Sequence, residues 1–456
     1  MFAGAGDGPA RCYLLNVAMP AATDRRVVIT GLGIVSPLGS DLGEFWAALI
    51  GGRSGIEPLA NLPALDGKVT FGGECRQFAG EIDNFGELEK DLKKSIRKAL
   101  KMMCRESMMA VASAQQAIVD GGFGTTPMDP ATSGVVFGSD YMLSPPEDFI
   151  SAMKKAGIGA GGFEYGKWGT DGLRDMNPLW MLSYLPNMPA SHIAIFNDLQ
   201  GPNNSLTMRE ASGLMAIREA AQTIARGHAD RMIAGATGTR IHSFKTVHAT
   251  QTEQLASADL PPHEACRPFD ANRTGMVVGE GAGAILLEEY ETAQARGAKI
   301  YGEILSTGSS AVADANLKSA RQLALANAAK SALGAVNFDP TQLGHVSAHA
   351  MGTRAGDVEE AGALREAMGD RAKEIPVVAA KSFFGNLGAG GGVVETVASL
   401  LALREGTLFP TLNFATPDPE CPVNASAAAT LPAGESFLKL SVTPQGQAAA
   451  LLVAKV

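Results

Sequence analysis

One glutamate, Glu210, stands where a predicted helix begins. It directly precedes the Ala-rich segment 211–227, whose apolar spacing is typical of a helix. A carboxylate at a helix start is favoured by the helix dipole, by about 0.3–1 kcal/mol. Its position therefore allows two interpretations. Glu210 either caps the helix, with Arg209 as its ion-pair partner, or performs acid–base chemistry on a bound molecule.

The cysteines and histidines lack the spacing of a metal site. The glycine-rich stretches 159–162 and 390–392 lack the Gly-Lys-Ser/Thr ending of a phosphate loop. We therefore expect neither a metal nor a bound cofactor. Because the cysteines form no CxxC pair, we expect reduced thiols in a cytoplasmic protein. The five are Cys12, Cys75, Cys104, Cys266 and Cys421.

Composition excludes several classes of function. The chain has 456 residues, of which 46% are apolar and 19% charged, as in a globular protein with a large core. Its net charge of −9 argues against general nucleic-acid binding. No apolar run reaches the roughly 18 residues that a membrane span needs. Residues 1–24 lack the features of a secretory signal, and we interpret them as a flexible extension.

The elements that would position Glu210 alternate between short buried strands and helices, which predicts an α/β protein. A second series of strands and helices begins near residue 300. No low-complexity linker divides the two series, so we expect them to share a core. Strands are predicted at 25–33, 134–138, 231–236, 281–288, 345–349, 377–380 and 448–453, and helices at 92–119, 211–227, 289–297, 356–368 and 392–404.

Four motifs, in this order, resemble those of the β-ketoacyl synthases, the thiolase-fold condensing enzymes of fatty acid and polyketide assembly. The resemblance runs from about residue 25 to the C-terminus. It implies a thiolase-like α/β fold with two similar βαβαβαββ halves, 25–290 and 291–456, in a five-layered α/β/α/β/α core. The motifs are RRVVITGLGIVSPLGSDLGEFWAALIGGRSG at 25–55, RPFD at 267–270 followed by NRTGMVVGEGAG at 272–283, His349 with Thr353, Gly356 and Asp357, and KSFFG at 381–385.

The resemblance also implies roles for individual residues. The family carries its acyl-accepting cysteine at the position of Glu210, and a carboxylate cannot accept an acyl chain by thioester exchange. The family's two histidines, which bind the thioester oxygen, correspond to His349 and Asn386. The family lysine corresponds to Lys381, which would support the site electrostatically or neutralise Glu210.

Each of these residues also has a purely structural interpretation. His349 and Asn386 would satisfy buried backbone groups. Lys381 would form an ion pair with Glu395 or Asp357.

Other positions depart from the family pattern where the substrate would bind. Two threonines normally hold the phosphopantetheine arm; Thr353 is present, but Met351 replaces the other. The resemblance assigns substrate contacts to Thr353, Met351 and Phe384. The glycine-rich gate of the family is replaced by Leu-Ser-Val-Thr-Pro-Gln-Gly at 440–446, which puts a normal acyl tunnel in doubt.

Three hypotheses follow. The first is a non-condensing homologue that supports an active synthase and resembles a chain-length factor. The second is a malonyl-carrier-protein decarboxylase that uses His349 and Asn386. The third is a noncanonical acyltransferase or condensing enzyme in which Glu210 acts as general base.

The resemblance also implies partners. Substrate would arrive on the phosphopantetheine arm of an acyl carrier protein. The chain would form a homodimer, or a heterodimer with an active ketosynthase. An acidic carrier protein would need a local basic patch on this acidic chain, and residues 93–101 are rich in Lys and Arg.

Overall fold

The backbone forms one mixed sheet covered by helices. The computed structural model describes residues 25–60, 62, 69–159, 161–428 and 431–456. Eleven strands are hydrogen-bonded in the order β11-β10-β9-β12-β13-β8-β1-β7-β6-β4-β5. A separate hairpin pairs β2 (Ile56–Pro58) with β3 (Phe71–Gly73). The predicted flexible extension at 1–24 lies outside the described residues.

The strand order repeats outward from β1 and β8, which pair in the middle of the sheet. On each side two antiparallel pairings come first, and parallel pairings follow towards the edge. One side contains β1 (Val27–Val35), β4 (Ser133–Ser139), β5 (Asn203–Thr207), β6 (Arg231–Thr239) and β7 (Glu280–Glu289), and the other contains β8 (Gly302–Ala311), β9 (His345–Ser347), β10 (Pro376–Val378), β11 (Asn424–Ala425), β12 (Ser436–Val442) and β13 (Gln447–Ala454).

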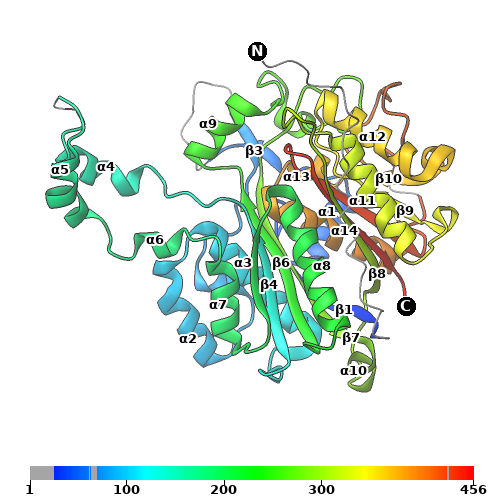
Figure 1. The fold of residues 1–456 in the computed structure, drawn as a ribbon, viewed down its shortest axis with the longest axis horizontal. Helices are drawn as coiled ribbons and strands as arrows, with labels where there is room; N and C mark the ends of the chain where they lie inside the picture. The colour runs from blue at the N-terminus through cyan, green and yellow to red at the C-terminus, as the bar shows by residue number, and fades with distance from the viewer. Residues whose placement is uncertain (1–24, 61, 63–68, 160, 429–430) are drawn as a thin grey trace, which may run out of the picture.

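Helices form the remaining layers of the thiolase-like fold (Figure 1). Helices α8 (Ser212–Ala225) and α14 (Gly391–Glu405) pack on each other and on strands of both sides, so they form the central layer. One outer layer contains α3 (Arg105–Ile118) and α7 (Met188–Asn197), and the other contains α11 (Arg321–Ala335) and α12 (Arg354–Met368). The two sides of the sheet are the two strand layers, so the predicted five-layered α/β/α/β/α arrangement is confirmed.

Glycine permits the closest helix–strand contacts at equivalent places in the two halves. A Cβ on Gly33 of β1 would lie 2.0 Å from the carbonyl oxygen of Ser113 in α3. A Cβ on Gly308 of β8 would lie 2.0 Å from the carbonyl oxygen of Ala328 in α11. Any larger residue would push the outer helix away from its strand.

The predicted helix over 92–119 is wrong as a single element. The chain forms α2 (Lys90–Ala99), a short 3₁₀ turn, and then α3 from Arg105. Cys104 between them has an extended backbone, and its amide hydrogen-bonds the Ser183 carbonyl oxygen at 3.3 Å. Apolar periodicity continues across this break, so spacing alone did not reveal it.

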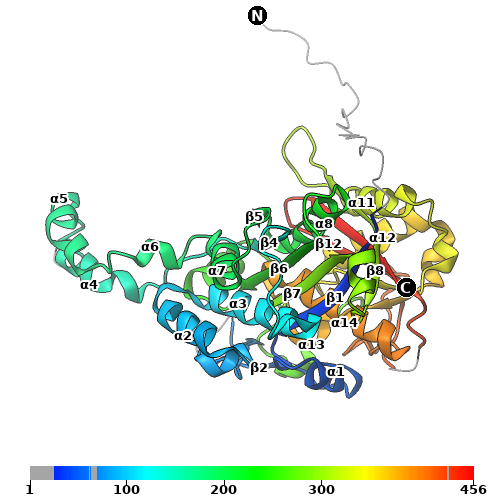
Figure 2. The same ribbon diagram turned by 90° about the horizontal axis from the view of Figure 1, so that it is seen from below.

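Residues 145–185 form an extension that the sequence patterns did not predict, and we call it the arm. It contains α4 (Glu147–Lys155), α5 (Tyr165–Lys167), short turns at Trp168–Gly172 and Leu173–Asp175, and α6 (Trp180–Ser183). Figures 1 and 2 both show α4 and α5 well away from the layered body. Among the described residues, no helix is long and apolar enough to cross a membrane.

The remaining helices are short or lie at the rim of the layered body. They are α1 (Leu42–Ile50), α9 (Ser243–Thr252), α10 (Tyr290–Ala295) and α13 (Lys381–Phe384).

Candidate functional site

Glu210 lies in the short connection between edge strand β5 and central helix α8. Arg209, immediately before it, has φ 48°, a left-handed conformation that is uncommon for arginine. The backbone of α8 begins after Ala211, and no side chain caps it. Glu210 therefore does not cap α8 as predicted, although the predicted Arg209 ion pair is present.

The partners of the Glu210 carboxylate are two arginines and an amide. The Arg240 guanidinium donates to Glu210 Oε1, and Asn386 Nδ2 donates to the same oxygen at 3.1 Å. Arg209 Nε lies 3.5 Å from Glu210 Oε2. Burial alone raises the pKa of Glu210, but Arg240 and Arg209 outweigh it and bring this pKa to about 2. The residue is 2% exposed, so it is a buried carboxylate held by cations.

Arg240 connects this carboxylate to a second acid. It follows β6 directly, is 2% exposed, and lies 3.4 Å from Asp140 Oδ2 through Nη2. A buried guanidinium needs such partners, because an isolated buried charge is very unfavourable. Sequence reasoning did not identify Arg240 or Asp140. The signal that could have identified Arg240 was a basic residue at the end of an otherwise buried strand.

His349 lies after β9 (His345–Ser347), on the other side of the sheet. The next residue, Ala350, has φ 46°. The Glu360 carboxylate fixes this turn by accepting hydrogen bonds from the backbone N–H groups of His349 at 2.6 Å and Ala350 at 2.7 Å. Burial, together with the cations Lys381 and Lys439, lowers the pKa of His349 well below its usual value, so the ring is neutral.

Lys381 orients the imidazole of His349. Its ammonium donates to the His349 carbonyl oxygen at 2.7 Å and to Glu395 Oε1 at 2.7 Å, and it lies 3.5 Å from His349 Nδ1. An ammonium group has no lone pair to accept with, so Nδ1 is the acceptor and Nε2 carries the proton. Lys439 donates to the other Glu395 oxygen. The predicted Lys381–Glu395 ion pair is present, and Lys381 does not neutralise Glu210.

A pocket opens beside His349. Met351 and Thr353 line it, as does the turn at 442–444 after β12, in the region where the family gate was expected. Glu253 also lines it, and Arg209 donates to Glu253 at 2.8 Å. The Arg209–Glu253 pair thus stands between this pocket and Glu210. The remaining lining residues are Arg321, Leu325, Gly356, Glu359 and Glu360.

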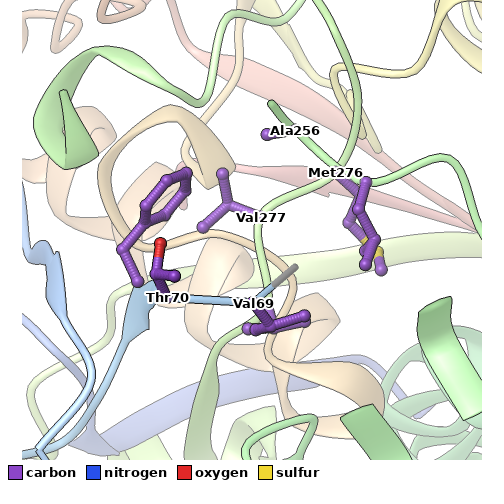
Figure 3. A pocket seen from close by; sticks show the side chains of 8 residues that line it. Val69, Thr70, Ala256, Met276 and Val277 are labelled. Atoms are coloured by element: carbon purple, nitrogen blue, oxygen red, sulfur yellow. The ribbon is translucent and has the colours of Figure 1, made fainter. Parts of the chain in front are cut away.

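A second, smaller pocket is lined mainly by apolar side chains and lies near Asn386. Figure 3 shows Val69, Thr70, Ala256, Met276 and Val277 around it. The Met276 sulfur lies 3.1 Å from Asn386 Nδ2, so this pocket reaches the neighbourhood of Glu210 through Met276. Phe71, Leu255 and Val278 complete its lining.

The predicted site residues therefore form two pairs. Glu210 contacts Asn386, and His349 contacts Lys381. Phe384 is buried in the core, where its ring stacks on Phe45 at 6.5 Å, and it lines neither pocket. Its substrate contact stays a prediction. Among the described residues, no group of His, Cys, Asp or Glu side chains could hold a metal ion.

The thiols of Cys104 and Cys266 are buried and contact groups other than Glu210. Burial raises the pKa of Cys104 and of Cys266 to about 12. The Cys266 sulfur contacts the Lys381 carbonyl oxygen at 3.1 Å, and the Cys104 sulfur contacts Met142 at 3.8 Å. Neither thiol has a recorded hydrogen bond to Glu210 or to the imidazole of His349, and neither has the lowered pKa of a reactive cysteine.

Family models match most of the chain. The model "Beta-ketoacyl synthase, N-terminal domain" matches residues 24–293, and "Beta-ketoacyl synthase, C-terminal domain" matches residues 301–415. Among curated relatives, 3-oxoacyl-[acyl-carrier-protein] synthase 2 of Synechocystis sp. is 33% identical over 401 residues, covering 87% of this chain and 90% of the relative. The granaticin polyketide putative beta-ketoacyl synthase 1 of Streptomyces violaceoruber has the same identity and coverage.

Solved structures are similar over nearly the whole chain. A structure described as a type II PKS acyl-carrier protein in complex with its ketosynthase bound to the hexaketide has a TM-score of 0.80 at 25% identity, covering 95% of this chain and 99% of that chain. The ishigamide ketosynthase/chain length factor has a TM-score of 0.79 at 26% identity, with the same coverage. The chain belongs to the β-ketoacyl synthase family.

Proposed function

We propose that this chain is a non-condensing ketosynthase homologue in acyl-carrier-protein-dependent fatty acid or polyketide biosynthesis. In this proposal Glu210 replaces the nucleophilic cysteine, and the chain supports a cysteine-bearing synthase, as a chain-length factor does. The observation that carries the proposal is the buried ion pair between Glu210 and Arg240. The likeness to the ketosynthase/chain length factor structure is consistent with it.

The surroundings of Glu210 disfavour chemistry at its carboxylate. A pKa near 2 makes it a weak base and a weak nucleophile. One oxygen accepts from both Arg240 and Asn386, and Arg209 approaches the other. Removing this carboxylate from Arg240 during a reaction would leave a buried guanidinium without one of its two acids. These contacts support a structural role for Glu210.

Decarboxylation of a malonyl group is the second candidate. One observation favours it: Lys381 fixes the tautomer of His349 in which Nε2 carries the proton, and this is the form that donates to a thioester oxygen. The second predicted donor, the Asn386 amide, is instead engaged by Glu210 at 3.1 Å. The pocket beside His349 also contains Glu253, Glu359 and Glu360, which would repel a malonate carboxylate. The non-condensing role therefore remains the leading proposal.

An acyl carrier protein is the proposed partner. Helix α2 presents exposed basic residues, and its buried side is formed by Ile96 and Ala99. A basic helix face would attract an acidic carrier protein to this acidic chain. The structure of a ketosynthase with its acyl-carrier protein among the similar folds supports this choice. The exposed basic residues are Lys90, Lys94, Arg97 and Lys98.

The test introduces a cysteine nucleophile at position 210. Wild type and Glu210→Cys are each incubated with acyl-carrier protein and malonyl-carrier protein, and products are followed by mass spectrometry. The proposal predicts no β-ketoacyl product from wild type. A Glu210→Cys chain that becomes acylated would indicate that the substrate passage is intact and that only the nucleophile is missing. Condensation by the wild-type chain without any other synthase would overturn the proposal. Carbon dioxide release by the wild-type chain would favour the decarboxylase.

A further inference from the structure

Arg209 lies between two acids that face different parts of the site. Its Nη2 donates to Glu253 Oε1 at 2.8 Å, and its Nε lies 3.5 Å from Glu210 Oε2. A planar guanidinium can hold a carboxylate at each of these two ends. Glu253 lines the pocket beside His349, whereas Glu210 is buried. The Arg209 side chain therefore bridges the wall between that pocket and the carboxylate behind it.

The backbone fixes both members of the Arg209–Glu253 pair. The positive φ of Arg209 is a conformation that persists only where the surrounding structure imposes it. Glu253 directly follows α9, and its N–H donates to the Ala249 carbonyl oxygen at 2.9 Å. The side chains of the pair are 17% and 14% exposed. A pair this sheltered is screened less by solvent and salt than a surface ion pair, so it forms a stable part of the wall.

A layer of methionine closes the same wall beside the ion pair. Met351 lines the His349 pocket and packs against the apolar cluster that contains Met276. The Met276 sulfur lies 3.1 Å from Asn386 Nδ2, and that amide donates to Glu210. Figure 3 shows Met276 beside the second pocket. Methionine side chains adapt their shape readily, so the ion pair is the more rigid part of this wall.

A thioester ligand offers Arg209 little in exchange for its acids. The carbonyl group and alkyl chain of a thioester carry no net charge, whereas Arg209 has a carboxylate on each side. Separating a sheltered arginine from its carboxylate costs more than separating the same pair at the surface. An uncharged chain that enters the pocket therefore gains too little from Arg209 to displace it.

We propose that the Arg209–Glu253 pair closes the inner end of the His349 pocket, so that a pantetheine thioester reaches His349 and is kept from position 210. The class of ligand rests on the proposed function, whereas the closure rests on the ion pair itself. The chain then has two separate obstacles to condensation, which are the carboxylate at position 210 and the closed passage in front of it.

Thiol labelling at position 210 tests the closure. Glu210→Cys keeps the bond between Arg209 and Glu253 and places a sulfur behind it. That sulfur, as thiolate, displaces iodide from iodoacetamide or bromide from a bromoacetamide derivative of pantetheine, and a carbon–sulfur bond forms. Peptide mass spectrometry follows the label at position 210 separately from labels on the native cysteines.

Opening the pair should speed this labelling. Adding Arg209→Ala to Glu210→Cys should raise the rate with the pantetheine probe at least about tenfold, because a closed gate allows reaction only during its brief openings. Glu253→Ala should act in the same direction and serves as a second variant. Exchanging the two residues, as Arg209→Glu with Glu253→Arg, rebuilds the pair in reverse and should restore slow labelling. Rates are compared at the fully ionised thiol, because losing Arg209 also takes a cation from the introduced sulfur.

The matched control adds Arg26→Ala to Glu210→Cys. It removes an ion pair with Glu303 of β8, outside the site, and should leave the labelling rate unchanged. Circular dichroism should show that every variant is folded. Labelling of Glu210→Cys as fast as that of the opened variants would overturn the proposal, and so would a reversed pair that labels as fast as they do. Labelling rates alone decide this comparison, so its failure is distinguishable from failure of the proposed function, which is measured by condensation.

Discussion

The two halves of the molecule each contribute a functional residue after a strand, yet they surround these residues in opposite ways. Glu210 follows β5 after a left-handed arginine, and His349 follows β9 before a left-handed alanine. On the first side a carboxylate is enclosed by two arginines, and on the second a neutral imidazole lines an open pocket. Each half thus contributes one of the two residues, and His349 is the one that lines the described pocket.

Each side also contains one acid that holds two cations. Glu395 lies between Lys381 and Lys439, and Glu210 lies between Arg240 and Arg209. The two acids differ in whether their cations have a second acid nearby. Arg240 also has Asp140 at 3.4 Å, and Arg209 has Glu253 at 2.8 Å. The Glu395 centre therefore depends on its acid more than the Glu210 centre does.

The largest effect should come from Glu395→Gln. Its two lysines are almost fully buried, and removing the charge takes away the carboxylate within ion-pair distance of both, at a loss of about 3–5 kcal/mol in unfolding free energy. Chemical denaturation measures this loss. Glu405→Gln, at an exposed pair with Arg404, is the matched control and should change stability by less than about 1 kcal/mol.

Glu210→Gln should have a smaller effect, of about 2–3 kcal/mol, because Asp140 and Glu253 still neutralise the arginines. The same denaturation experiment gives the value. If Glu210→Gln proved as damaging as Glu395→Gln, the alternative acids would contribute little, and the contrast between the two sides would be lost. A stabilised Glu210→Gln variant would indicate a strained acid kept for catalysis.

A third prediction concerns pH on the His349 side. Burial lowers the pKa of His345, the first residue of β9, to about 4. This folded value lies below the usual 6.5, so the neutral ring stabilises the fold above pH 6.5, and that stability is lost as pH falls through about 4. His345→Asn should remove up to about 3 kcal/mol of this acid sensitivity. Thermal unfolding between pH 7 and pH 4 measures it, and identical pH profiles for both chains would contradict it.

The smallest effect should come from Arg321→Ala at the mouth of the pocket. Arg321 pairs with Glu359 at 2.6 Å, but both side chains are about one-third exposed. Exposed pairs contribute about 0–1 kcal/mol, so stability should barely change. Binding of a phosphopantetheine thioester, followed by calorimetry, should weaken, since the pocket would lose a cation from its lining. Unchanged affinity would place the ligand elsewhere.

Much of the fold could be predicted from the sequence, because the buried strands and the Ala-rich central helix have distinct apolar patterns. The β6 strand and helices α8, α12 and α14 lie within a few residues of their predicted ranges. The break at Cys104 and the arm could not be predicted. The break interrupts no apolar period, and the arm has exposed apolar residues whose spacing indicates no buried face.

The site was predicted less completely. Motif positions identified Glu210, His349, Lys381 and Asn386, and the structure groups them in two contacting pairs. Arg209 and Glu395 were predicted as ion-pair partners of Glu210 and Lys381, but Arg240 was missed. Arg240 lies 30 residues from Glu210 in the chain, and only the tertiary fold brings the two together.

Intact-mass spectrometry of the wild-type chain after exposure to an acyl-carrier protein tests the central claim most directly. If Glu210 is a buried counter-ion in the place of a nucleophile, the mass of the chain stays unchanged while a cysteine-bearing ketosynthase in a parallel reaction gains one acyl group. A covalent acyl adduct on the wild-type chain, mapped by peptide digestion to any residue near His349 or Glu210, would contradict the account.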